Sequence, residues 1–337
     1  MVRHALVLAD RRCAAFRPMF ASAMPALLPA GGKPVLEHCL EDLWEAGVRE
    51  VVIAVPRGGD AIRQAVGTGE RFGLAVRYLE VSDHYRPSEV LGMSGLPRGV
   101  PFLVARGDML RSRMARQLHE RAPQPGPDVV HGVVGAAHGG IALVNRHSRA
   151  GIDALRWPLL PVSCLGKGQA WVDMPDRRVE HLDSLASWFE ACLGTLDGSF
   201  AGVVPDGRPD PRHGLLAAPR ARIARSVTAL GIARVGRHAA VHAAVELSGR
   251  VEIGDRSVID QGAQLIESVV LPGTYVGRGV RLQNAVACGP WLYRRDLDSC
   301  QRVEDPLLLG GDGPALTAVE TGRPALASEP ASRCAAA

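Results

Sequence analysis

The sequence predicts two domains, an α/β domain with a doubly wound, mostly parallel sheet and a parallel β-helix that follows it. Short apolar runs alternate with helix-type periodicity over residues 1–203, which is typical of strand–helix–strand units. From residue 222 onward an apolar residue recurs every six positions, which is typical of stacked coils. A chain of 337 residues is long enough for two domains of about 150 residues each.

The α/β domain is expected to begin with a buried strand at residues 5–9, a helix that opens at Pro34 and a second buried strand at residues 51–55. Proline suits the first helical position, and Gly47 is expected to end the helix. The apolar residues of this helix recur at helical spacing: Leu36, Cys39, Leu40 and Leu43. A short helix and two strands continue the alternation at residues 60–66, 74–81 and 102–105.

Doubly wound sheets bind ligands outside the carboxyl ends of their strands. The first strand runs into Ala9 and Asp10, and the strand at residues 102–105 runs into Gly107 and Asp108. Because parallel neighbours end at the same edge of a sheet, we expect the loop after Ala9 to lie close to Asp108. A site is therefore expected at this edge.

The second domain is predicted from a hexad repeat. Residues 204–221 are rich in proline and have no period, so we expect a linker there. The repeat then places an apolar residue at Val235, Val241, Leu247, Ile253, Ile259 and Leu265, and, after a one-residue deletion, at Val270, Val276 and Leu282. One coil side cannot bury its apolar residue alone, so the coils must stack into a continuous core. Residues 222–293 resemble a left-handed β-helix, and the tail at 294–337 is expected to be partly disordered.

Composition limits the cellular setting and the partners. No apolar run approaches the roughly 20 residues of a membrane span, and the N-terminus does not resemble a secretory signal. The seven cysteines include no pair at CxxC spacing, so neither a disulfide framework nor a zinc site is indicated. The formal charge of +4 is spread along the chain, which argues against nucleic acid as a partner. We expect a cytoplasmic protein that is not inserted in a membrane.

Two segments of the α/β domain carry a resemblance to a known family. Residues 8–18 read LADRRCAAFRP, and residues 24–34 read MPALLPAGGKP. They resemble the signature of the sugar-1-phosphate nucleotidyltransferases, roughly LAxGxGTRLRP and PKxLLPVxGKP, and in particular mannose-1-phosphate guanylyltransferase-like members with an appended β-helix. The resemblance covers about residues 1–290 and implies a Rossmann-like nucleotidyltransferase domain. It implies nucleotide binding at Ala9, Asp10, Arg11 and Arg12 and a catalytic role for Arg17.

The signature loop of this chain lacks several residues that the family uses to contact the phosphates. In the family, two glycines of the loop let backbone amides approach the phosphates, and this chain has Arg11 and Cys13 at those positions. Ala15 occupies the position of the family's loop arginine, and Met24 or Pro25, depending on the alignment, occupies that of its lysine. Loss of one preorganised charge typically costs about 10²–10³ in rate. The resemblance therefore predicts little catalysis unless Arg11 and Arg12 turn toward the phosphates.

A pair of carboxylates is retained. Asp108 follows a strand that ends in Gly-Asp, and Asp173 lies in a Trp-Val-Asp segment, and both resemble family segments whose aspartates hold Mg²⁺. Mg²⁺ takes one or two carboxylates together with phosphate oxygens and water, so the resemblance implies Mg²⁺ at Asp108 and Asp173. The alternative is that Asp108 caps a helix beginning at Met109 and that Asp173 forms a turn with Pro175.

Three functions remain open from the sequence. The first is an enzyme that joins a nucleoside triphosphate to a sugar 1-phosphate and releases pyrophosphate, supplying NDP-sugar for surface polysaccharide. The second is a catalytically inactive relative that binds a nucleotide or NDP-sugar and regulates or scaffolds an active partner. The third is an acyltransferase with His238 or His242 as general base. Because the β-helix commonly mediates oligomer contacts in the family, we expect a homo-oligomer, and an active paralogue is a further candidate partner.

Overall fold

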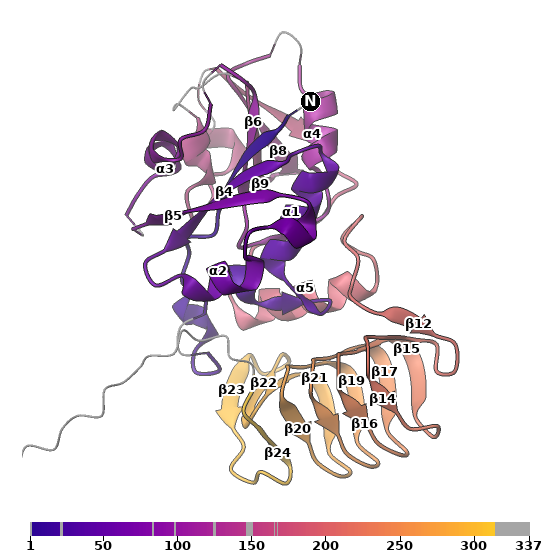
Figure 1. Ribbon diagram of the computed structural model, residues 1–337. Helices are drawn as coiled ribbons and strands as arrows, with labels where there is room; N and C mark the ends of the chain where they lie inside the picture. The colour runs from indigo at the N-terminus through magenta and orange to yellow at the C-terminus, as the bar shows by residue number, and fades with distance from the viewer. Residues whose placement is uncertain are drawn as a thin grey trace, which may run out of the picture.

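The computed structural model describes residues 2–20, 23–82, 84–97, 99–123, 126–145, 151–164, 166 and 168–313. An α/β domain packs on one side of a β-helix, with the long helix α5 (Leu185–Leu196) between them (Figure 1). The predicted fold class is confirmed. Within the described ranges, every helix is too short or too polar to cross a bilayer.

A seven-stranded sheet forms the centre of the α/β domain, in the order β10-β8-β9-β6-β1-β4-β5. Its strands are β1 (His4–Leu8), β4 (Glu50–Pro56), β5 (Ala75–Val81), β6 (Phe102–Arg106), β8 (Val129–Val134), β9 (Ala137–Val144) and β10 (Gln169–Asp173). β9 runs antiparallel to both of its neighbours, and the other pairs are parallel. The carboxyl ends of β1, β6 and their parallel partners therefore meet at one edge.

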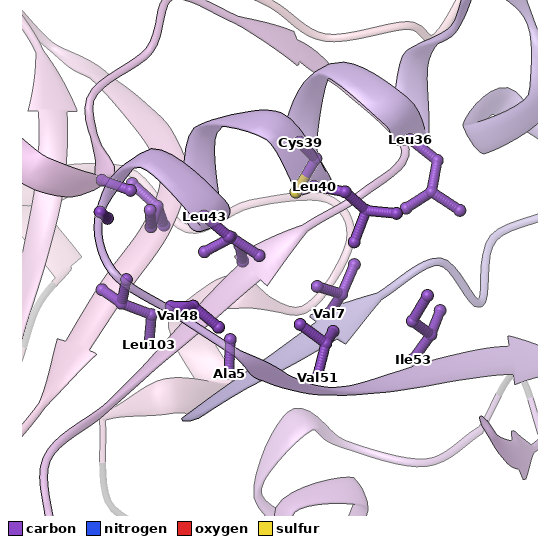
Figure 2. Close-up of a cluster of buried hydrophobic side chains, with 14 of the residues drawn as sticks. Ala5, Val7, Leu36, Cys39, Leu40, Leu43, Val48, Val51, Ile53 and Leu103 are labelled. Atoms are coloured by element: carbon purple, nitrogen blue, oxygen red, sulfur yellow. The ribbon is translucent and has the colours of Figure 1, made fainter. Parts of the chain in front are cut away.

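Helices cover both faces of this sheet. α1 (Val35–Glu45) turns its four periodic apolar residues onto β1 and β4, as Figure 2 shows for Leu40 and Leu43 above Val7 and Val51. α4 (Ala115–Arg121) packs into the same buried cluster, and so does α2 (Asp60–Val66). α3 (Pro87–Met93) covers the opposite face. The predicted helical periodicity of α1 is confirmed.

The β-helix is built from two long sheets of short strands. One sheet contains β12 (Arg208–Asp210), β13 (Leu215–Ala217), β15 (Thr228–Val235), β17 (Glu246–Ile253), β19 (Gln264–Val270), β21 (Arg281–Cys288), β22 (Trp291–Arg294) and β23 (Ser299–Arg302). The other contains β14 (Arg222–Ile223), β16 (Ala240–Val241), β18 (Val258–Ile259), β20 (Thr274–Val276) and β24 (Leu309–Gly311). All nine apolar hexad positions are buried, with at most 4% exposure. The expected one-residue deletion appears as a register shift between β17 and β19, at Ser248 and Val251.

The ends of the β-helix extend further than the repeat. β12 and β13 lie within the expected linker, and β13 pairs in parallel with β15 as part of the first coil. At the other end β23 pairs with β22, and β24 pairs with β20. These strands form by pairing with a neighbouring coil, so they leave no period in their own sequence. Residues 314–337 of the expected tail lie outside the described residues.

One buried apolar cluster spans both domains. α5 contributes Trp188 and Leu193, and the β-helix contributes Val269, Leu271 and Val286. Burial of apolar surface is the main favourable contribution to such an association. The domains therefore share a core rather than meeting through a linker alone.

A buried carboxylate adds a polar link between the domains. The turn between β2 (Pro29–Ala30) and β3 (Lys33–Pro34) donates its Gly32 N–H to Glu252 Oε1 at 2.7 Å and its Gly31 N–H to Oε2 at 3.2 Å. The guanidinium of Arg234, itself fully buried, lies 3.8 Å from Glu252 Oε1. Burial raises the pKa of Glu252, although Arg234 opposes this shift. Lys33, the residue after Gly32, instead forms an ion pair within the α/β domain, with its Nζ 2.7 Å from Glu41 Oε1.

Candidate functional site

The two loops expected to form a site lie side by side at the carboxyl edge of the sheet. β1 and β6 are parallel neighbours with Leu8 opposite Arg106. The chain continues this pairing, because Gly107 N–H donates to Leu8 O at 2.8 Å. The residues that follow the two strands, Asp10 and Asp108, are thereby brought to the same place.

Asp108 is fully buried, and Arg106 bonds both of its carboxylate oxygens. Arg106 Nε donates to Oδ1 at 2.9 Å, and Nη2 donates to Oδ2 and, at 2.8 Å, to Asp10 Oδ1. Burial alone would raise the pKa of Asp108, but Arg106 and then Arg11 outweigh it and lower that pKa. Burial also opposes the charge on Arg106, yet Asp108 and Asp10 raise its pKa. Both groups are therefore charged and neutralise each other inside the protein.

Arg11 stands where the family signature has its first glycine, and its side chain folds back into the protein. Its Nη2 donates to the carbonyl of Asp108 at 3.1 Å and to the carbonyl of Leu182. Its Nε lies 3.6 Å from Asp108 Oδ2. The guanidinium lies over the ring of Trp157, 3.6 Å from the ring centre, a favourable cation–π arrangement. Burial lowers the pKa of Arg11, opposed by Asp108, and an arginine remains protonated in proteins.

The carboxylates present do not fit the expected Mg²⁺ pair. Mg²⁺ needs carboxylate lone pairs that face the ion, and both oxygens of Asp108 already accept hydrogen bonds from Arg106. Asp173 is exposed at the end of β10, and its Oδ1 accepts the Gly135 N–H at 2.9 Å. β10 and β6 are separated by β8 and β9, which is three strand spacings or about 14 Å. In the described part of the chain, no three His, Cys, Asp or Glu side chains are grouped to hold a metal.

The structure also tests the alternative roles of the two aspartates, a helix cap for Asp108 and a turn for Asp173. The chain after Asp108 forms the short strand β7 (Leu110–Arg111), not a helix that Asp108 could cap. Asp173 is the last residue of β10, and its side chain accepts the N–H of Gly135 in the β8–β9 connection, so it does not form the expected turn with Pro175. Asp108 is thus held by ion pairing, a role that the sequence did not suggest.

The remaining predicted site residues are placed differently. Ala9 is buried and donates its N–H to Ala54 O at 2.9 Å, so it belongs to the sheet. Arg12 is exposed, and its Nη2 donates to Arg57 O at 2.7 Å. Arg17 is exposed at the end of the 3₁₀ turn η1 (Ala14–Phe16) and does not line the pocket formed by the loop. The structure therefore brings Asp10, Arg11 and Arg12 together but not Arg17.

A pocket of about 170 Å³ opens beside these residues. Its lining contains four arginines, two aromatic residues, a proline and a carboxylate: Asp10, Arg11, Arg12, Tyr85, Pro87, Arg106, Arg156 and Trp157. The four guanidinium groups outnumber the carboxylates of Asp10 and Asp108 by two. The pocket is therefore suited to an anion.

A chain of neutral imidazoles lies behind this pocket. Gly140 N–H donates to His138 Nδ1 at 2.9 Å, so the proton of His138 is on Nε2, which lies 3.0 Å from His131 Nδ1. His131 Nε2 then donates to Gln169 Oε1 at 3.0 Å. Burial, and then the neighbouring imidazoles, lower the pKa of His138 to about 3. The ring of His181 packs edge-on against that of Trp157, with 5.6 Å between the ring centres, and so contacts a residue that lines the pocket.

Five of the pocket residues were not predicted, and one of them is Pro87, the first residue of α3. Arg106 could have been identified from the sequence, because it is a charged residue at the end of an otherwise apolar strand and stands two positions before Asp108. Tyr85, Arg156 and Trp157 lie in segments without periodicity or motif, and the fold alone brings them to the pocket.

The two histidines of the acyl-transfer alternative lie on the outside of the β-helix. His238 occupies a turn position with φ 56°. His242 is half exposed, and its Nδ1 lies 3.0 Å from Asp260 Oδ1. Both histidines belong to the β-helix, whereas residues 8–18 of the family signature belong to the α/β domain.

Comparisons with known proteins agree with the signature segments. No protein-family model matches the chain. Over 78 residues, 23% of this chain and 22% of the relative, it is 42% identical to a glucose-1-phosphate thymidylyltransferase of Streptomyces griseus. Over 113 residues, 32% of this chain and 47% of the relative, it is 33% identical to an N-acetylmuramate alpha-1-phosphate uridylyltransferase of Neisseria meningitidis. The chain resembles the sugar-1-phosphate nucleotidyltransferases. It spans less than half the length of each of these nucleotidyltransferases.

A solved structure of a candidate glucose-1-phosphate thymidylyltransferase from Bacillus anthracis, in complex with a sucrose, is also similar. The TM-score is 0.45 at 14% identity, and the match covers 56% of this chain and 94% of the other. A likeness at this level carries no functional argument.

Proposed function

We propose that this protein takes part in NDP-sugar supply as a nucleotidyltransferase relative that binds a nucleotide, a sugar 1-phosphate or an NDP-sugar without transferring the nucleotidyl group. The observation that carries the proposal is the Asp108 carboxylate, which is fully buried with both oxygens bonded by Arg106. In-line displacement at a phosphate relies on a metal ion to offset the developing charge. A carboxylate neutralised in this way does not serve that ion.

Binding is supported by the pocket next to Asp108. It is lined by four guanidinium groups and by two aromatic side chains, the groups that phosphates and ring systems contact. The pocket thus has more guanidinium groups in its lining than carboxylates beside them. This combination favours a binding protein that regulates or scaffolds an active partner.

The active transferase is the second candidate. It is supported by the order of the signature segments and by the relatives, a thymidylyltransferase and a uridylyltransferase that act on sugar 1-phosphates. In that case Arg11 and Arg12 would have to replace the lost cations. The contacts of Arg11 with Asp108 and with Leu182 argue against this, because they hold its guanidinium inside the protein.

The two candidates are separated by calorimetric titration followed by a turnover assay. Nucleoside triphosphates, GDP-mannose and UDP-glucose are titrated with and without Mg²⁺, and pyrophosphate release is measured with sugar 1-phosphates. We expect binding that is insensitive to Mg²⁺ and no pyrophosphate release. Release that Asp173→Asn abolishes would establish the transferase instead. Light scattering on the same samples tests the predicted homo-oligomer, and mixing with an active paralogue tests the predicted partner.

A further inference from the structure

We infer that a separate pocket between the two domains binds an uncharged, mostly apolar molecule about the size of one six-membered ring. In this interdomain pocket the α/β domain forms one wall with Leu27 and Pro34, and the β-helix forms the other with Leu271 and Pro272. It shares no lining residue with the pocket beside Arg11. The inference therefore does not depend on the proposed function.

The size and the walls of the interdomain pocket suit a single apolar ring. Its volume is about 180 Å³, and an apolar cavity of about 150 Å³ in another protein binds benzene. Seven of the thirteen lining residues are leucine, valine or proline, and two are glycine. Transfer of an apolar ring from water to such walls is favourable.

Arg234 sets the polar requirement of the ligand. Its side chain is fully buried and lines the pocket. Its Nε donates to Asp206 O at 2.8 Å and its Nη1 to Ile253 O at 3.4 Å, whereas Nη2 has no hydrogen-bond acceptor among the described residues. A buried donor without an acceptor is unfavourable. An oxygen on the bound ring would supply the acceptor that Nη2 lacks.

The charges around Arg234 require this oxygen to be uncharged. Carboxylate oxygens of Asp206, Glu252 and Asp255 each lie 3.8 Å from the guanidinium, so an anion beside Nη2 would be repelled by three negative groups. A cation would be repelled by Arg234 itself and by Lys33, which also lines the pocket. The oxygen of a ketone accepts the N–H without either repulsion.

Four compounds with the same ring test the inference on the full chain: cyclohexanone, methylenecyclohexane, cyclohexanecarboxylate and cyclohexylammonium. They differ in the group that would face Arg234, which is an uncharged oxygen, a methylene, an anion or a cation. We expect cyclohexanone to raise the unfolding temperature, because it binds only the folded chain. In calorimetric titration it should bind about 10-fold or more tightly than each of the other three, the effect of a hydrogen bond to a charged group.

Leu27→Phe tests the location of the site. Leu27 lines the interdomain pocket and is 7% exposed, so a larger side chain there takes up the space of the ring and should abolish binding. Leu230→Phe is the matched control, because Leu230 is 68% exposed on β15 and lies outside the lining; it should leave the affinity unchanged. A crystal of the unsubstituted protein soaked in cyclohexanone should show the ring between Leu27 and Pro272, which tests the location without any variant.

The contrary results are equally definite. If cyclohexanone does not bind, or if it appears elsewhere in the soaked crystal, the inference is overturned. It is also overturned if Leu27→Phe, shown to be folded by circular dichroism, binds cyclohexanone as tightly as the unsubstituted protein. Binding of methylenecyclohexane or of cyclohexanecarboxylate as tight as that of cyclohexanone would mean that Arg234 does not select an uncharged oxygen, and would overturn the ligand class.

Discussion

At the residue scale, Asp108 is the point on which the charge balance of the pocket depends. It is fully buried, and the cations of Arg106 and Arg11 both rely on it. Removing one partner of a buried ion pair leaves the other charge uncompensated, at a cost of about 3–5 kcal/mol. We therefore expect Asp108→Asn to lower the free energy of unfolding by that amount in urea titrations.

Asp173→Asn is the matched control for this substitution. Asp173 is exposed and accepts one backbone hydrogen bond, so its replacement should change stability by about 0.5 kcal/mol or less. Equal effects of the two substitutions would contradict the charge arrangement described for Asp108.

His138 should make the free energy of unfolding fall as the pH is lowered. Its pKa is lowered to about 3 in the folded protein, against about 6.5 when unfolded. Below pH 6.5 the unfolded chain therefore binds the proton and the folded chain does not, so stability falls as the pH is lowered. The loss is about 2 kcal/mol between pH 6.5 and pH 5.

His138→Asn should reduce the acid sensitivity measured by urea unfolding at pH 5, 6 and 7. His38, whose pKa burial lowers to about 4, retains its own contribution in this variant, so a reduced slope is expected and not a flat one. A slope equal to that of the unsubstituted protein would mean that His138 is protonated in the fold.

The sequence could predict only part of the site at this scale. Asp10, Arg11 and Asp108 are placed by two strands whose apolar pattern is plain, so their proximity follows from the fold class. The role of Arg106 does not, because it depends on which side chain the guanidinium meets inside the protein. Tyr85 and Arg156 come from loops whose course is set by packing on α3 and not by any local pattern.

At the element scale, the turn between β2 and β3 requires glycine at position 32. Gly32 has φ 80°, and a Cβ there would overlap the guanidinium of Arg234, which is fully buried and donates to Asp206 O at 2.8 Å. A left-handed conformation costs a non-glycine residue about 1–2 kcal/mol. The overlap adds about 1–3 kcal/mol, so we expect Gly32→Ala to destabilise the protein by about 3 kcal/mol in thermal or urea unfolding.

Gly262→Ala separates the two contributions. Gly262 has a similar φ of 70°, but an added Cβ would meet no atom within 4 Å. Its replacement should cost only the conformational part, about 1–2 kcal/mol. If both variants lose the same stability, the close approach of the turn to Arg234 is not what constrains position 32.

The hexads predicted the coils of the β-helix, and apolar runs and helical periodicity predicted α1, α2 and the strands β1, β4, β5 and β6. The nine apolar hexad positions and the four apolar residues of α1 are all buried, because burial of one face is what creates those periods. β12, β13, β23 and β24 were not predicted, since each has three or four residues and exists through backbone pairing with a neighbour. The hydrogen bonds that form them involve no particular side chains.

At the scale of the whole molecule, the shared core should make the two domains unfold together. Leu271 of the β-helix is buried in the cluster that contains Trp188 of α5. Truncation of a buried leucine costs about 2–5 kcal/mol. We expect Leu271→Ala to lower the unfolding midpoint in a single transition, seen at the same denaturant concentration by tryptophan fluorescence and by far-UV circular dichroism.

Leu230→Ala provides the matched comparison. Leu230 lies on β15 of the same β-helix but is 68% exposed, so its replacement should change stability by about 0.5 kcal/mol or less. Two separate transitions in Leu271→Ala would instead mean that the α/β domain and the β-helix fold independently.

The pairing of Asp108 with Arg106 and Arg11 also makes the three positions depend on one another. Replacing Arg106 alone by an apolar residue would leave Asp10 and Asp108 without the cation that both now contact, and replacing Asp108 alone would leave two buried cations without this carboxylate. Each single replacement thus gives a less stable protein. Substitutions at the three positions are therefore expected to occur together and not one at a time.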